Sequence, residues 1–224
     1  MSLRDIRVHE TLPPQWVDFT TTSPTYDPMR GRHSRRGIAS SGLSANTRVE
    51  TLRGQVAARN LQIGDQVKIA GGGFAPLRWV GTSRPHDDTG LPMRRLTADG
   101  GECTTLLAPD HLVLIRHQRA ELLFGTAEVL CPAKYLGTGG MFRSDAHVNP
   151  VFVHLLFDTH EMVKCGDDWV ESLRPDMDRI RAEDLATAHE IIQRMPRLAS
   201  RQGLASYMHT RPVLDEREAQ MLIG

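Results

Sequence analysis

Short runs of alternating apolar and polar residues, each ended by a turn signal, dominate residues 41–174. Strict alternation is typical of a half-buried strand, and Gly, Asn and Asp between such runs mark tight turns. The pattern therefore predicts an all-β domain of short, mostly antiparallel strands. The alternating runs cover residues 47–52, 56–61, 66–69 and 77–80, and they stop at Arg53-Gly54, Gly64-Asp65, Gly71-Gly72-Gly73 and Gly81.

Two further runs, at residues 112–115 and 151–157, are continuously apolar. Such runs belong to strands that are buried on both faces, so these two are predicted to be central strands. Residues 121–132, with Gly125 among them, are ambiguous, and strand–turn–strand is the arrangement they suggest.

The apolar period changes to that of a helix over residues 175–198, where Pro175 precedes the stretch and Pro196 ends it. We expect one amphipathic helix, straight or kinked, that packs on the β-domain. Further along, Asp215 and Glu218 have the spacing of an N-terminal capping box, which predicts a last short helix. The apolar residues of the two helices are Met177, Ile180, Leu185, Ala188, Ile191, Ile192 and Met195, and then Ala219, Met221 and Leu222.

Three parts of the chain are expected: a flexible leader (1–40), the β-domain (41–174) and a C-terminal helical extension (175–224) packed on it. Four prolines interrupt the leader, and four arginines crowd into residues 30–36 beside glycines. Such a segment has little to pack and is expected to be solvated. A docking or nucleic-acid arm is the alternative, but no aromatic side chain is interleaved with the arginines.

Charge and composition narrow the classes of function. The 27 basic residues match the 27 acidic ones, which argues against a nucleic-acid or membrane-surface partner. No apolar run approaches the roughly 18 residues of a membrane span, and the first residues lack the apolar core of a secretory signal. We expect a soluble protein with a cytoplasmic address, and export without a cleavable signal is the open alternative.

No cofactor or metal is expected. Cys103, Cys131 and Cys165 lie far apart without metal-ligand spacing, so they are interpreted as reduced structural thiols. Residues 71–73 resemble a phosphate loop only in composition, because no Lys-Ser/Thr and no long helix follow, and a hairpin tip is the expected structure. The chain also contains no Gly-x-Ser-x-Gly elbow.

Two histidines are the first candidates for chemistry. The turn Ala108-Pro109-Asp110 delivers His111 to the mouth of a buried strand, where a polar imidazole needs a partner. His160 follows an Asp-Thr turn at the end of the strand that contains His154.

Taken with their surroundings, these segments resemble the Hint domain, the hedgehog/intein fold, and most closely its bacterial standalone branch. The resemblance runs from about residue 42 to the C-terminus. It implies a fold of short antiparallel strands with pseudo-twofold halves and with its termini close together. The motifs that carry it, in order, are Thr47-x-Val49-x-Thr51, Asn60-Leu61-x-x-Gly64-Asp65-x-Val67, Pro76-Leu77-Arg78-Trp79-Val80-Gly81, Leu107-Ala108-Pro109-Asp110-His111, Phe124-Gly125-x-x-Glu128-Val129-Leu130, His154-x-Leu156-Phe157-Asp158-x-His160-Glu161 and Val170-Glu171-Ser172.

The resemblance implies self-processing, with the protein's own chain as substrate. In Hint domains the first residue, usually Cys and sometimes Ser, attacks the preceding carbonyl and converts the amide into a (thio)ester. A histidine in a Thr/Ser-x-x-His turn donates to the leaving nitrogen, and the Thr or Ser polarises the carbonyl. His111 matches that histidine, and His160 matches the one that assists the later step in inteins.

This sequence departs from the pattern at two positions. Counted back from Thr47, the nucleophile position is Gly42, which has no side chain to attack with. Ala108 stands at the Thr/Ser position three residues before His111 and removes a hydrogen-bonding group. We therefore expect a degenerate Hint domain without efficient autoprocessing.

Three hypotheses remain open at this point. In the first, Ser41 or Ser44 replaces the missing nucleophile after a shift in register, and residues 1–40 are released. In the second, the domain no longer cuts and binds an unknown protein partner. In the third, His111, His154 and His160 form an unrelated small-molecule or metal site. The self-processing site predicts that Gly42, residues 105–111 and residues 154–160 meet in one cleft.

Overall fold

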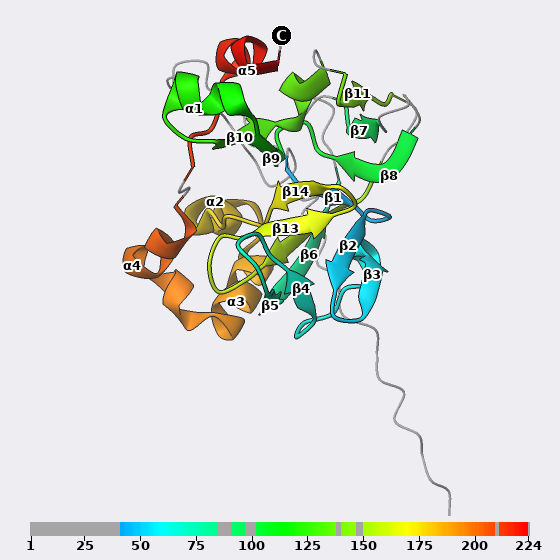
Figure 1. Ribbon diagram of the computed structural model, residues 1–224. Coiled ribbons are helices and arrows are strands. Elements are labelled where there is room, and N and C mark those ends of the chain that lie inside the picture. The colour runs from blue at the N-terminus through cyan, green and yellow to red at the C-terminus, as the bar shows by residue number, and fades with distance from the viewer. Residues whose placement is uncertain are drawn as a thin grey trace, which may run out of the picture.

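The computed structural model describes residues 41–84, 91–96, 102–137, 140–146, 150–208 and 211–223, and the expected leader lies outside them. Two antiparallel sheets form the body of the molecule (Figure 1). The first is six-stranded, in the order β11 (Phe142–Ser144), β7 (Met93–Leu96), β8 (Glu102–Leu107), β1 (Leu43–Ser44), β12 (Phe152–Leu156) and β6 (Trp79–Ser83). The second is eight-stranded, in the order β10 (Glu128–Pro132), β9 (Leu112–Arg116), β14 (Asp168–Glu171), β13 (Met162–Cys165), β2 (Arg48–Thr51), β4 (Gln66–Lys68) and β5 (Phe74–Pro76), with β3 (Gly54–Ala57) paired to β2. The predicted mostly β, antiparallel class is confirmed.

The two continuous apolar runs are central strands, as predicted. β12 lies between β1 and β6, and all five of its residues are buried. β9 lies between β10 and β14. The glycines at 71–73 form the tip of the β4–β5 hairpin, which confirms the expected turn.

The prediction that a strand stops at Gly81 is wrong, because β6 continues through this glycine to Ser83. The indole of Trp79 lies over Gly81, and a Cβ atom there would sit 2.0 Å from the ring. Gly81 therefore makes room for a buried aromatic side chain within the strand instead of ending it.

The strand–turn–strand arrangement suggested for residues 121–132 is wrong for the first strand, whereas the turn and the second strand are present. Its first part is a helix, α1 (Gln118–Phe124), whose N-cap His117 accepts a hydrogen bond from the Arg119 amide. Gly125 ends the helix in the left-handed conformation, with φ of 70°. That conformation is the usual glycine C-cap, and only after it does β10 begin.

The single helix expected over residues 175–198 is two helices and a 3₁₀ turn: α2 (Met177–Glu183), α3 (Leu185–Arg194) and η4 (Pro196–Ala199). Asp184 has extended φ and ψ, ends α2 and caps α3, because its carboxylate accepts from the amides of Ala186 and Thr187. The predicted apolar period is nevertheless correct for the buried face. Trp79, Leu156, Met177, Ile180, Ala188, Ile191, Met195, Leu198 and Tyr207 form one buried cluster.

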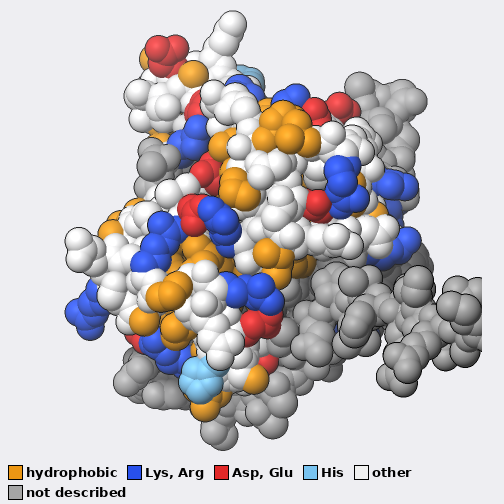
Figure 2. All heavy atoms as spheres, turned by 90° about the horizontal axis from the view of Figure 1, so that it is seen from below, with side chains coloured by type: hydrophobic (Ala, Val, Ile, Leu, Met, Phe, Trp, Pro, Cys, Tyr) orange, Lys and Arg blue, Asp and Glu red, His pale blue; other side chains and the backbone are white. Residues whose placement is uncertain are grey.

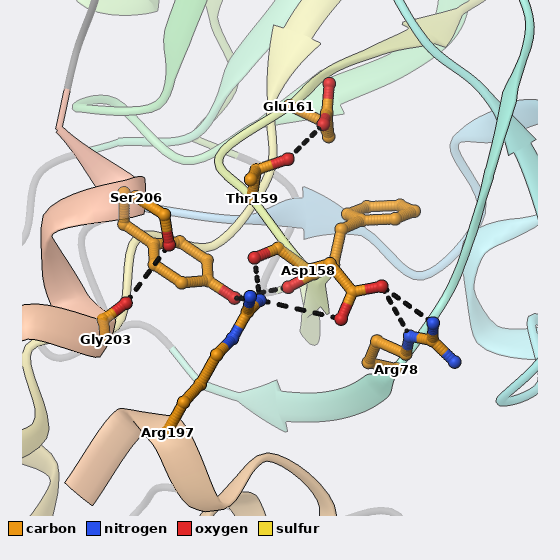
Figure 3. Close-up of polar contacts among 9 residues, drawn as sticks. Arg78, Asp158, Thr159, Glu161, Arg197, Gly203 and Ser206 are labelled. Atoms are coloured by element: carbon orange, nitrogen blue, oxygen red, sulfur yellow. Dashed lines mark hydrogen bonds and ion pairs between the residues drawn. The ribbon is translucent and has the colours of Figure 1, made fainter. Parts of the chain in front are cut away.

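Polar contacts add to the docking of this helical region (Figure 3). Asp158, which follows β12, pairs with Arg78 at 2.7 Å and with Arg197 of η4 at 3.5 Å. The Tyr207 hydroxyl, in the turn η5 (Ala205–Tyr207) that follows α4 (Arg201–Leu204), donates to the carbonyl of Phe157. The residues that follow β12, Phe157 and Asp158, therefore contact two 3₁₀ turns of the helical region, η4 and η5.

The predicted capping box is present at the start of the last helix, α5 (Glu216–Ile223). The Glu218 carboxylate accepts from the Asp215 amide at 2.8 Å, and the Asp215 carboxylate accepts from the Glu218 amide at 2.9 Å. Ala219 and Leu222 are buried, whereas Met221 is exposed. α5 lies at the end of the molecule that carries α1 and β10 (Figure 1).

Across the parts of the chain that the structure describes, no helix has the length and apolarity required to traverse a bilayer. On the face shown in Figure 2, basic and acidic side chains are interspersed around apolar ones.

Candidate functional site

The backbone of Gly42 is held from two sides just before β1. Its amide donates to Nδ1 of His111 at 3.0 Å, and its carbonyl accepts from the Ala108 amide at 3.0 Å. The turn at residues 108–111 makes this possible, because the His111 amide closes it on the Ala108 carbonyl at 3.1 Å. Pairing of Leu43 with Leu107 and with Val153 then fixes β1 between its neighbours.

His111 is a neutral hydrogen-bond acceptor at this site. A backbone N–H can only donate, so Nδ1 facing the Gly42 amide carries a lone pair. Burial lowers the pKa of His111 to about 4, against the opposing effect of Glu171, which raises it. The same nitrogen lies 2.9 Å from the Ser41 hydroxyl, so that hydroxyl donates to the imidazole. The site thus pairs a hydroxyl with an unprotonated base.

Glu171, at the end of β14, links the two predicted histidines. Its Oε1 accepts from the Leu112 amide at 3.0 Å and lies 3.9 Å from His111 Nδ1, whereas its Oε2 lies 3.5 Å from His160 Nε2. Burial alone would raise the pKa of this carboxyl, but the nearby His160, the imidazole of His111 and the hydrogen bond from the Leu112 amide lower it to about 2. The Ser41 hydroxyl lies 3.4 Å from Oε1. A buried carboxylate therefore faces Ser41 and both imidazoles.

The ring of His154, on β12, lies beside Gly42 and is held by the hydroxyl of Ser83. Its Nε2 is 2.7 Å from the Ser83 hydroxyl. Burial, with a smaller effect of His111, lowers the pKa of His154 to about 3.

Gly42 occupies a position that a larger residue does not fit. Its φ of 129° is one that L residues rarely adopt. A Cβ atom there would lie 2.8 Å from Cβ of Phe152 and 3.0 Å from Cε1 of His154. The space that a nucleophilic side chain would need at residue 42 is therefore taken by β12.

A small cavity opens where these groups meet. Gly42, His111 and His154 line it, whereas His160 does not and lies 3.5 Å from Oε2 of Glu171. The lining residues are Ser41, Gly42, Leu43, His111, Val153, His154, Leu155, Glu171 and Leu173.

Other predicted site residues lie elsewhere. The Ser44 hydroxyl accepts from the Asn46 amide at 3.4 Å, and Ser44 does not line the cavity. Asp110 pairs with Lys134 at 2.7 Å. Ala108 contributes only its backbone, and its side chain is fully buried. Thr105, on β8, is buried but is not among the lining residues.

Sequence reasoning placed His154 in the expected cleft but missed Glu171 and Ser83 as members of the site. One signal was present for Glu171, because a carboxylate at the end of an apolar strand needs buried partners. The Ser83 contact with His154 had no such signal, since Ser83 was expected to lie beyond the end of its strand.

The cysteine thiols and a metal centre are the other candidates for chemistry. Cys131 and Cys165 are free and buried, and burial raises the pKa of both thiols, that of Cys131 to about 12. Such thiols are poor nucleophiles. Within the described ranges, no group of three His, Cys, Asp or Glu residues is arranged to hold a metal ion, and this includes the three histidines of the metal hypothesis.

The chain is similar to one protein-family model and to several solved structures. A protein-family model described as a Hint domain matches residues 41–177. Among solved structures, the gp41-1 intein is similar at 15% identity and a TM-score of 0.36 over 59% of this chain and 98% of that one. The MchDnaB-1 intein is similar at 12% identity and a TM-score of 0.37 over 58% of this chain and 99% of that one. No curated protein sequence matches the chain significantly.

Proposed function

The chain belongs to the Hint-domain family, and from this membership we propose that it is an autoprocessing-type domain whose acyl shift at the nucleophile position, Gly42, has been lost. The hydrogen bonds that the Gly42 backbone makes with His111 and Ala108 support this proposal. The loss concerns the peptide bond between Ser41 and Gly42, which a nucleophile at residue 42 would cleave.

The observation that carries this proposal is the contact between the Gly42 amide and His111 Nδ1 at 3.0 Å. In a Hint domain the equivalent histidine donates a proton to the leaving nitrogen of the scissile bond. Here the imidazole is aligned with that nitrogen, but residue 42 carries neither a thiol nor a hydroxyl.

Two further features support the loss. The place of a Cβ atom at Gly42 is filled by Phe152 and His154, so the site is shaped around the glycine. Ala108 cannot supply a hydroxyl to the carbonyl, and removal of one such donor typically raises the barrier by roughly 3 kcal/mol.

The test is the mass of the purified full chain after prolonged incubation near neutral pH, with and without a thiol or hydroxylamine. We expect no product that begins at Gly42 under either condition, because no ester or thioester forms at that residue. A product with Gly42 at its N-terminus would overturn the proposal.

A further inference from the structure

We infer that the outer edge of β10 is a docking site for a peptide that adds a strand and continues as a helix, that residues 211–223 of this chain are its resident occupant, and that this occupant supports the turn that carries His111. β10 is the end strand of the eight-stranded sheet. The Hint-domain match ends at residue 177, so the docked segment lies beyond the part of the chain that the family covers. The inference does not depend on the proposed function.

The first argument is that the segment joins β10 as a parallel strand. Val213 pairs with Leu130. The Leu130 amide donates to the Pro212 carbonyl at 2.8 Å, and the Leu130 carbonyl accepts from the Leu214 amide at 2.8 Å. The end strand of a sheet presents N–H and C=O groups that an added peptide can satisfy. The main chain of the segment therefore binds as an added strand does.

The second argument is that side chains of the segment fit the surface that β10 provides. Leu214 is only 2% exposed and joins the main apolar core, as do Ala219 and Leu222 of α5. Arg211 pairs with Glu128 of β10 at 2.6 Å. When a peptide adds to a sheet edge, its main chain provides affinity and its side chains provide specificity. The partner that fits is thus an extended segment with one basic residue and a buried leucine, followed by an amphipathic helix.

The third argument is that the segment packs on a different surface from the helices that precede it. Those helices bury apolar side chains in the cluster around Trp79, whereas α5 lies beside α1 and the turn η3 (Ala133–Gly137) (Figure 1). The capping box of Asp215 and Glu218 closes within the segment itself. A segment that supplies its own helix cap and packs on a surface of its own can bind there as a unit.

The turn η3 connects the docked segment to the turn that carries His111. The Ala133 amide donates to the His111 carbonyl at 2.9 Å, and the Lys134 amide donates to the Pro109 carbonyl at 3.0 Å. Both donors belong to η3, beside which α5 lies. The docked segment therefore supports the element that holds the His111 turn, and release of the segment should loosen that turn.

The experiment uses the full chain with a protease recognition sequence inserted between His209 and Thr210, so that the protein folds before its tail is cut. We expect the cleaved chain to stay folded and to exchange its tail for a fluorescent peptide of residues 211–224. The uncleaved chain should bind this peptide at least about a hundredfold more weakly, because its own tail competes at a high effective concentration. Fluorescence anisotropy measures binding, and circular dichroism confirms that the cleaved chain is folded.

Peptide variants test whether binding occurs by strand addition. N-methylation of Leu214 removes the donor to the Leu130 carbonyl and should weaken binding about tenfold or more. N-methylation of Val213 is the matched control, because its amide makes neither of the two bonds with Leu130, and it should weaken binding less. Leu214→Ala in the peptide removes the buried side chain and should weaken binding on the order of a hundredfold.

Amide hydrogen exchange tests the link to the His111 turn. The Gly42 amide donates to His111, so its exchange in the cleaved chain should be faster without a bound tail and should slow when the peptide binds. The Ile180 amide, which donates to the Asp176 carbonyl in the helical region, is the control and should not respond.

Each outcome has a definite reading. A cleaved chain that unfolds, or that takes up no peptide at concentrations up to about 1 mM, would overturn the docking site, since a tail held in the same chain acts at a comparable effective concentration. Equal binding of the two N-methylated peptides would exclude strand addition. Exchange at Gly42 that ignores the peptide would overturn the support of the His111 turn. The loss of the acyl shift at Gly42 is tested separately, by the mass of the uncleaved chain.

Discussion

Gly42 combines two constraints that can be separated by mutation. Its φ of 129° is unfavourable for any side chain, and its close approach to Phe152 leaves no space for one. Gly73 has a φ of 90°, but a Cβ atom added there would have nothing within 4 Å, so it shares only the first constraint.

We expect Gly42→Ala to lower the free energy of unfolding by more than Gly73→Ala. Backbone strain of this kind typically costs about 1–3 kcal/mol, and displacement of β12 adds to it at Gly42 alone. Urea unfolding of the two variants measures the difference. Equal losses would show that the contact with Phe152 is easily relieved.

Because Phe152 and His154 occupy the space for a side chain at residue 42, Gly42→Cys should fail to cleave the bond between Ser41 and Gly42, although it supplies a thiol.

The buried imidazoles predict a dependence of stability on pH. The pKa values of His111 and His154 are lowered in the folded state to about 4 and about 3, from an ordinary value of 6.5. Below about pH 6.5 the unfolded chain therefore binds more protons than the folded one. The free energy of unfolding falls as the pH drops, by on the order of 1 kcal/mol per pH unit for each imidazole. Glu171, whose pKa is lowered from 4.5 to about 2, extends the loss below pH 4.5.

Chemical denaturation at several pH values between about 7 and 4 tests this dependence. His154→Gln removes one buried titrating group and should reduce the slope, whereas His189→Gln, at an exposed position, should not. A free energy of unfolding that stays constant over this range would contradict the burial of neutral imidazoles.

Part of the site was predictable from the sequence because it depends on short segments. The turn at residues 108–111 drew attention to His111, and the resemblance to the Hint domain, counted back from Thr47, indicated Gly42 as the nucleophile position. Glu171 was not assigned a role, because it reaches His111 only through the pairing of β14 with β9, at Val170 and Val113. Sequence gives no register between strands that lie so far apart in the chain.

At the scale of elements, Asp184 decides that residues 177–194 form two helices. Its Oδ1 accepts from the amides of Ala186 and Thr187 at 2.9 and 3.1 Å, and its Oδ2 accepts from the Thr187 hydroxyl at 2.6 Å. These contacts hold the chain in an extended conformation at the junction, where a continuous helix would require helical dihedral angles.

Asp184→Ala should therefore lower the free energy of unfolding by about 1–2 kcal/mol, the usual effect of removing an N-cap. Asp178→Ala is the matched control, because Asp178 lies in the first turn of α2 and its side chain is 98% exposed. Thermal or urea unfolding compares the two. A loss no larger than that of Asp178→Ala would mean that the helices stay separate without the cap.

Elements with a strong apolar period were predictable, and those decided by single residues were not. β9 and β12 were found because burial on both faces leaves continuous apolar runs. The helical period of residues 177–195 was also recognised, but the break at Asp184 was not, because Asp caps a helix in some contexts and lies within one in others. α1 was missed because its short sequence shows little amphipathic pattern, with Leu122 exposed and Ala120 buried.

At the scale of the whole molecule, two kinds of contact attach the helical region 175–208 to the β-domain. One is the apolar cluster around Trp79 and Leu156, which includes the fully buried Leu198. The other is the polar network of Asp158 with Arg78 and Arg197 (Figure 3), whose side chains are 41–50% exposed. Exposed ion pairs contribute little in water, because solvent and salt screen them. The apolar cluster should therefore account for most of the docking energy.

Two substitutions compare what the apolar cluster and the ion pairs of Asp158 contribute to the free energy of unfolding. Leu198→Ala creates a cavity at the contact and should lower the free energy of unfolding by about 2–5 kcal/mol. Asp158→Ala removes both ion pairs and should lower it by no more than about 1 kcal/mol, with a difference that shrinks at high salt. Urea unfolding at low and high ionic strength measures both. If Asp158→Ala lowered the free energy of unfolding more than Leu198→Ala, the ion pairs would be the main attachment of the helical region to the β-domain. That attachment would then weaken as salt is added.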